Sequence, residues 1–197
     1  LATHTLTVPT EALGHIAPTT VYPWSSAMEM AQSVRDLGAL VGREAPAEDL
    51  AKQLEAQLAV PPPSDGPKVL LALAMGGETD GQVWYIKRNS LHGQALHAAG
   101  AQNAVFEDVD GAPAMPIEEL LKVDPDLVIV IASREGVSAE EIAALTAPFE
   151  RITALRATQT GRLGALSGGA LFSEGPAILD LVTALRSEIT RLQAVGR

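Results

Sequence analysis

Two short apolar runs, KVLLALA at Lys68–Ala74 and LVIVIA at Leu127–Ala132, constrain the fold of this 197-residue chain most. Neither run alternates polar with apolar residues, which is typical of strands covered on both faces of a sheet. Helical patterns lie between the two runs, at Ser90–Ala99 and Pro116–Lys122. Strands that alternate with helices at this spacing predict right-handed βαβ units and a mostly parallel sheet.

Further elements extend this α/β prediction to the end of the chain. Short strands are predicted at Ala104–Phe106, Ile152–Leu155 and Leu163–Leu166, and a final helix at about Glu174–Ala194. Apolar residues recur in that helix at intervals of three and four, which places them on one face. They are Ile178, Leu181, Val182, Leu185, Ile189 and Leu192.

The first third of the chain predicts two helices followed by a spacer. Ser26 and Glu29 have the spacing of a capping box, in which the hydroxyl and the carboxylate each satisfy a free amide of the first turn. Gly42 should end this helix, and a second helix should begin near Pro46. Pro61–Pro63 cannot continue a helix and favours an extended spacer.

Composition argues against several classes of function. The chain has 24 Asp and Glu against 14 Lys and Arg, a net charge of −10. Nucleic acid and anionic membranes are therefore not expected as partners, because phosphate binding needs clustered cations. No apolar run approaches the roughly 18–20 residues of a transmembrane helix. The absence of cysteine from the sequence excludes disulfides, a cysteine nucleophile and thiolate metal sites.

The sequence offers little to support catalysis. His92 and His97 are five positions apart, which on a helix turns them about 140° from each other and makes a shared metal site poor. The glycines at Gly76–Gly77 and Gly161–Gly169 match neither a dinucleotide fingerprint nor a phosphate-binding loop. We therefore expect that the protein is not an enzyme and that it has neither a metal site nor a cofactor.

The few aromatic residues are the best indication of a ligand site. Trp24 follows the β-prone segment Thr19–Tyr22, and Trp84 and Tyr85 lie close to Arg88. Ligands bind at the carboxyl ends of parallel strands, so these aromatics and Arg88 are candidates to line a cleft. A guanidinium could hold a ligand carboxylate or phosphate through two hydrogen bonds. The alternative is that all four are ordinary core or rim residues.

Several motifs, in order along the chain, resemble one known family. Asn89–Gln94 (NSLHGQ) followed by Gly100–Ala104 (GAQNA) is similar to the family's N-S-L-x-x-Q … G-G-x-N pattern. Ile117–Ile129 resembles its x-E-x-L … P-D-x-I run, and Gly175–Ile178 (GPAI) resembles its G-P-R-I motif with Ala177 in place of the arginine. The family is that of the substrate-binding proteins of iron-chelate and cobalamin ABC importers, the helical-backbone class.

The resemblance implies two Rossmann-like α/β lobes with mostly parallel sheets, joined by a long backbone helix. Residues 1–44 would be the remnant of an N-terminal lobe that is incomplete here. Residues 45–65 would be the connecting helix and Pro-rich spacer, and residues 66–197 the C-terminal lobe. The implied location is periplasmic or extracytoplasmic, with any signal segment and lipid anchor outside this sequence.

The implied function is capture of a metal chelate in a cleft between the lobes and its delivery to an ABC permease dimer in the inner membrane. Trp24 would lie on one side of the cleft, and Trp84, Tyr85 and Arg88 on the other. Glu174 is the candidate for docking on the permease. Cobalamin, a ferric siderophore and haem all stay open as the chelate, and Tyr85 and His92 are the residues that could ligate haem iron.

Two other classes of function also stay open. One is a non-transport ligand-binding or interaction module of the same fold. For either binding class, self-association also stays open if the chain is natively truncated. The other is an enzyme on an α/β scaffold, since fold does not imply function.

Overall fold

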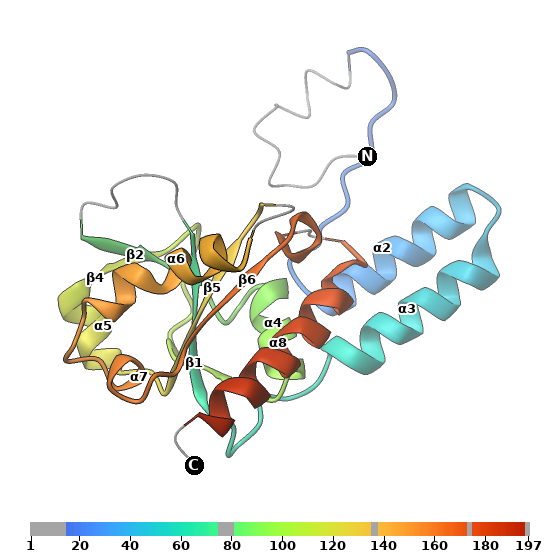
Figure 1. The fold of residues 1–197 in the computed structure, drawn as a ribbon. Helices are drawn as coiled ribbons and strands as arrows, with labels where there is room; N and C mark the ends of the chain where they lie inside the picture. Colours follow the sequence, from blue (N-terminus) through green and yellow to red (C-terminus); the bar gives the residue numbers. More distant parts are fainter. Residues whose placement is uncertain (1–14, 75–80, 135–137, 173–174, 196–197) are drawn as a thin grey trace.

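A computed structural model of the protein describes residues 15–74, 81–134, 138–172 and 175–195 (Figure 1). Within these ranges a four-stranded parallel sheet forms the centre of the molecule. Its strands, in spatial order, are β3 (Gln102–Asn103), β1 (Lys68–Leu73), β5 (Leu127–Ala132) and β6 (Leu163–Ser167). The predicted α/β fold with a mostly parallel sheet is confirmed.

The two apolar runs form the central pair of strands. β1 and β5 pair from Val69 opposite Leu127 to Leu73 opposite Ile131, and all six residues of β5 are buried. Each fully buried Leu or Ile stabilises the fold by about 1.5–3 kcal/mol relative to an exposed one. A strand covered on both faces gains this stabilisation at every position, which explains the lack of alternation.

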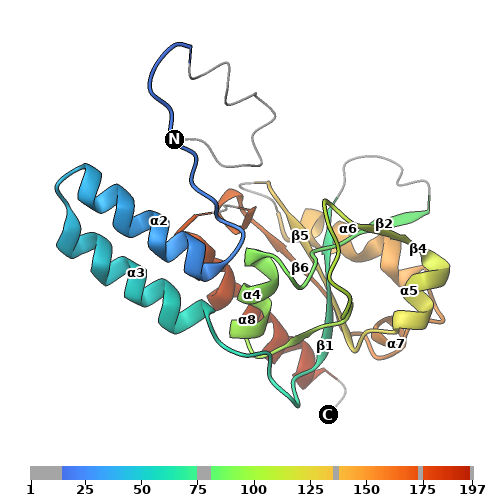
Figure 2. The same cartoon turned by 180° about the vertical axis from the view of Figure 1, so that it is seen from behind.

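Helices cover both faces of the sheet, as Figures 1 and 2 show. α4 (Leu91–Ala98) and α8 (Ile178–Ala194) pack on the face that carries Leu71 and Ile129. α5 (Ile117–Val123), α6 (Ala139–Glu150) and the short α7 (Arg156–Gln159) contribute to the core on the opposite face. The connections that leave β1 and β5 thus lie on opposite faces, which makes the carboxyl ends of these two strands the place where such sheets bind ligands.

A helix hairpin lies beside this α/β unit. α2 (Ala27–Leu40) and α3 (Glu44–Leu58) run antiparallel and extend away from the sheet (Figure 2). Their buried apolar side chains belong to the same hydrophobic cluster as those of α4, α8 and one face of the sheet. The division into lobes at residues 44 and 65 stays a prediction.

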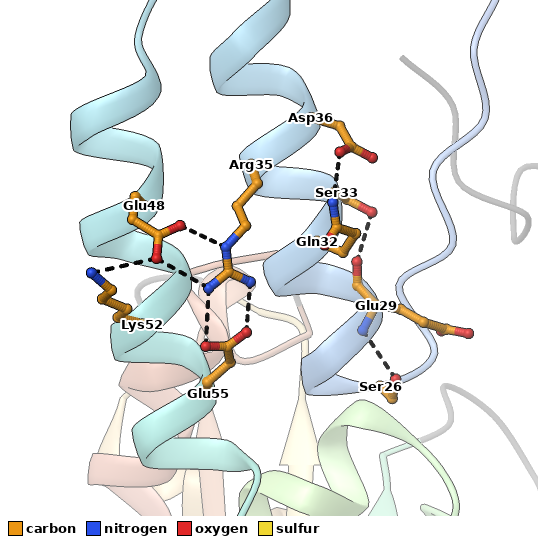
Figure 3. Close-up of polar contacts among 9 residues, drawn as sticks. All are labelled: Ser26, Glu29, Gln32, Ser33, Arg35, Asp36, Glu48, Lys52 and Glu55. Carbon is orange, nitrogen blue, oxygen red and sulfur yellow. Dashed lines mark hydrogen bonds and ion pairs between the residues drawn. The ribbon is translucent and has the colours of Figure 1, made fainter.

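Polar and steric contacts fix the hairpin, as Figure 3 shows for the polar ones. The half-buried Arg35 of α2 bonds both Glu48 and Glu55 of α3. A Cβ on Gly38 would collide with the Cβ of Ala47, so the helix axes approach closely at this point. Glycine at Gly38 is therefore required by packing rather than by backbone conformation.

Some predicted elements are wrong or shifted. Ile152–Leu155 is a turn, in which the amide of Leu155 donates to the carbonyl of Ile152. The Leu155 side chain is buried in the core on one face of the sheet, which explains the apolar sequence of this turn. Thr19–Tyr22 forms no strand, only a single-residue bridge at Val21. The strand expected at Ala104–Phe106 begins two residues earlier, as β3. Gln102 and Asn103 are the residues that pair with Lys68 and Val69 of β1.

Serine residues cap both α2 and α6, but only the cap of α6 is a full capping box. Ser138 and Glu141 satisfy each other's backbone amides at the start of α6. At the start of α2, Ser26 accepts from the amide of Glu29, but the Glu29 carboxylate accepts from the amide of Ser25 instead of Ser26. The chain before α2 turns so that the earlier amide is the one in reach.

Candidate ligand-binding site

A cavity of about 570 Å³ lies at the carboxyl end of β1. It is formed by the end of this strand, the chain from Tyr85 to the first turn of α4, the loop before β4 (Ala114–Pro116), the 3-10 helix η1 (Gly169–Phe172) and the chain before α2. Its lining residues are Trp24, Ser25, Leu73, Tyr85, Ile86, Lys87, Asn89, Ser90, Leu91, His92, Gly111, Ala112, Pro113 and Phe172. The size is within the range of small-molecule sites.

The segment Ile86–Ser90 forms one wall, and hydrogen bonds with Asn103 and with the first turn of α4 hold it in place. Asn103 Nδ2 donates to the carbonyl of Ile86 at 2.9 Å. The Ser90 hydroxyl donates to the carbonyl of Lys87 at 2.7 Å and accepts from the amide of Gly93 at 3.0 Å. A Cβ on Gly93 would collide with the carbonyls of Lys87 and Arg88, so only glycine lets this segment cross the start of α4.

A second part of the wall, Gly111–Pro113, belongs to a loop that is bonded at both ends to the chain from Tyr85 to Asn89. On one side the amide of Tyr85 donates to the carbonyl of Pro113 at 3.2 Å, next to the antiparallel pairing of β4 with β2 (Gln82–Trp84). On the other side Arg88 Nε lies 2.8 Å from Asp108 Oδ1, and Asn89 Nδ2 donates to the carbonyl of Val109 at 3.3 Å.

The cavity lining is mostly apolar, with a small set of polar groups. Lys87 is its one cation, and no carboxylate is among the lining residues that the structure describes. Burial, and secondarily the charge of Glu107, raises the pKa of Tyr85 above its usual value. This composition suits an apolar ligand with an anionic group at the edge.

Two rings lie together at the η1 side of the cavity. The centroids of His92 and Phe172 are 6.5 Å apart with the rings tilted by 56°. His92 Nε2 lies 3.2 Å from the carbonyl oxygen of Leu171, so the imidazole is oriented by the same short helix. Trp24 Nε1 is buried and has no hydrogen-bond partner among the residues with assigned positions.

The structure brings three of the sequence-derived candidates into this cavity. Trp24 and Tyr85, expected as ligand contacts, and His92, named with Tyr85 as a residue that could ligate haem iron, are all lining residues. Trp84 on β2 and Arg88 are not among the lining residues, and Arg88 pairs with Asp108 instead. Glu174 lies outside the described residues.

Sequence reasoning missed Lys87 and Phe172 as lining residues. Lys87 stands next to Arg88, which the sequence singled out, and this neighbouring position is the signal that could have found it. Phe172 has no local signal, because its contact with the cavity depends on how η1 folds over the sheet. In the part of the chain with assigned positions, no three His, Asp or Glu are grouped to hold a metal ion.

A parallel α/β sheet with an apolar cavity at the carboxyl end of a strand is an arrangement in which small molecules bind. The sequence matches the family described as periplasmic binding protein over residues 6–166, and the chain belongs to this family. It is a binding protein and not an enzyme. No curated protein matches the sequence.

Solved structures share the fold at low sequence identity. An ABC transporter substrate-binding protein from Listeria monocytogenes EGD-e has 18% identity and a TM-score of 0.70 over 91% of this chain and 70% of its own. A periplasmic heme-binding protein from Pseudomonas aeruginosa has 21% identity and a TM-score of 0.72 over 95% and 70%. The periplasmic vitamin B12-binding protein BtuF of Vibrio cholerae has 16% identity and a TM-score of 0.61 over 94% and 71%.

Across the residues placed by the structure, no helix combines the length and the apolar character needed to cross a membrane.

Proposed function

We propose that this protein is the substrate-binding protein of an ABC importer and that it captures a metal chelate for delivery to a membrane permease. The observation that carries the proposal is the apolar cavity at the carboxyl end of β1 in a chain of the periplasmic binding protein family. The names of the similar structures, which bind heme or vitamin B12 or serve an ABC transporter, support the class of cargo.

Haem is the chelate that the cavity lining favours. Trp24, Tyr85 and Phe172 offer aromatic surface on which a flat macrocycle can stack. Lys87 offers an ammonium group for a propionate at the edge. Cobalamin is bulkier than a porphyrin, and a ferric siderophore presents more polar surface than a porphyrin to a lining that is mostly apolar where the structure describes it.

The same proposal includes a location and a partner. The protein would act on the outer side of the cytoplasmic membrane, as the description of its family indicates. Its partner would be the permease dimer of the importer, and Glu174 stays the candidate contact. A cleft that is largely preformed would give affinity without a large closing motion.

Titration with haemin, hydroxocobalamin and ferrichrome, followed by visible absorbance, tests the function. We expect saturable binding of haemin at micromolar or tighter affinity. Saturable binding of one of the other two chelates in its place would correct the ligand. If none of the three bound to folded protein, the proposal would be overturned.

A pair of tryptophan variants tests the location of the site. Trp24→Ala should weaken haemin binding about tenfold, because an aromatic contact contributes about 0.5–1.5 kcal/mol beyond its buried area. Trp84→Ala is the matched control, since Trp84 lies outside the cavity lining, and it should leave the affinity unchanged. Circular dichroism checks that both variants are folded. The reverse pattern would place the ligand elsewhere.

A further inference from the structure

The loop Asp108–Pro113 forms a cavity wall that is attached to the rest of the site at two ends. At Pro113 the attachment is the Tyr85 amide together with the β2–β4 pairing. At Asp108 and Val109 it consists of one ion pair and one hydrogen bond, from Arg88 and Asn89. Between the two ends Gly111 has a φ of +68°, so the loop bends where its residues reach the cavity.

We propose that Arg88 is a positioning residue, which holds the Gly111–Pro113 wall in its ligand-ready place through Asp108 and does not itself contact the ligand. This inference rests on the proposed function for its effect on affinity. The role differs from the one expected from the sequence, which was a direct contact between Arg88 and an acid group of the ligand.

The placement of Arg88 supports an indirect role. Its neighbours Lys87 and Asn89 line the cavity, whereas Arg88 does not. Its Nε bonds Asp108, and 42% of its side chain remains exposed to solvent. Lys87 is therefore the cation in place for a ligand acid group, and Arg88 is committed to the loop.

The pair is expected to affect binding more than stability. Exposed ion pairs contribute little to the free energy of unfolding. A loop held at both ends, however, presents its wall already ordered, whereas a loop released at Asp108 must be ordered when ligand binds. Loss of the pair should thus weaken binding while the unfolding midpoint stays nearly constant.

A double-mutant cycle with Arg88→Gln and Asp108→Asn, read by haemin affinity, separates the two roles of Arg88. If Arg88 acts by positioning, each single variant should weaken haemin binding about three- to tenfold, and the double variant should be no weaker than either single one. If Arg88 contacts the ligand, Asp108→Asn should leave haemin affinity unchanged or raise it, and that result would overturn the inference. The control is Lys122→Gln, which removes a similar exposed ion pair with Glu119 on α5.

A second measurement needs no ligand and keeps the inference testable if haemin is not the cargo. Backbone NMR order parameters of Val109–Ala112 in the ligand-free protein should fall in both Arg88→Gln and Asp108→Asn, relative to Lys122→Gln. Unchanged order parameters would overturn the positioning role. Absence of chelate binding with lowered order parameters would overturn the proposed ligand and leave the positioning role in place.

Discussion

Arg35 of α2 and Glu55 of α3 form an ion pair with two hydrogen bonds, with Nη1–Oε1 at 2.6 Å and Nη2–Oε2 at 3.0 Å. The same guanidinium reaches Glu48 through Nε at 2.7 Å (Figure 3). Glu48 and Glu55 lie two turns apart on one side of α3. One cation between them therefore fixes the position of α2 along α3.

Removal of this cation should weaken the hairpin more than removal of a neighbouring one. Arg35→Gln leaves two carboxylates of α3 without their shared partner, so we expect a lower urea midpoint of unfolding. Lys52→Gln is the control, because Lys52 is more exposed and bonds only Glu48, at 3.4 Å. The difference between the two variants should shrink at high salt. Equal midpoints at low salt would contradict this role for Arg35.

The same network predicts a loss of stability in acid. Hydrogen bonds from Arg35 lower the pKa of both Glu48 and Glu55 below the usual value, which is about 4.3 in an unfolded chain. Between the unfolded and folded pKa values the unfolded state binds more protons, so stability rises with pH in that window. The contribution is complete above the unfolded pKa and disappears as pH falls through the folded pKa.

Urea unfolding measured from pH 3 to pH 6 tests this linkage. Wild-type protein should lose stability over this window faster than Arg35→Gln, in which the two carboxyls return toward their usual pKa. Parallel pH profiles for the two proteins would show that the pairing contributes nothing to the acid response.

Gly38→Ala should destabilise the protein although alanine favours helices. Helix propensity gains up to about 1 kcal/mol, but the new methyl meets Ala47 in a closely packed contact, and overpacking costs about 1–3 kcal/mol. Chemical unfolding gives the net value. Adding Ala47→Gly should recover part of the loss, because it removes the atom that collides. A net gain in stability for Gly38→Ala alone would contradict the packing seen between α2 and α3.

His97 provides a local probe of the charge on Arg88. Burial is the larger cause and Arg88 the smaller cause of a pKa below the usual value for His97. In Arg88→Gln the pKa, followed by NMR titration of the imidazole protons, should rise but remain below about 6.5. Asp108→Asn should give no rise, because it leaves the positive charge in place. A full return to the usual value in Arg88→Gln would mean that burial has little effect.

Elements whose residues face one environment along their length could be predicted from the sequence. β1 and β5 are apolar at nearly every position because both faces are covered, and α8 shows its buried face as a repeat of three and four. The Ser138 cap was also predictable, because its two members, Ser138 and Glu141, lie within one four-residue stretch of sequence. The strand prediction at Ile152–Leu155 was wrong, because an apolar turn buried against a sheet has the same composition as a short strand.

The candidate ligand-binding site also divides into residues that the sequence predicted and residues that it did not. The sequence placed Trp24 and Tyr85 among the candidate ligand contacts by residue type and by position near strand ends, and both line the cavity. It could not show that Arg88 would turn to Asp108 while Lys87 and Phe172 would line the cavity. Those outcomes depend on which loops meet after the helices have packed.

The sequence by itself thus determined the class of fold, because hydrophobic periodicity and local caps record how each segment is buried. Only the tertiary structure decided which side chains share the cavity and which pair outside it. Trp24 and Phe172 come from opposite ends of the chain, and they line one cavity because α2 and α8 belong to one hydrophobic core. Such long-range contacts arise from the packing of whole elements and leave no periodic signal in the sequence around either residue.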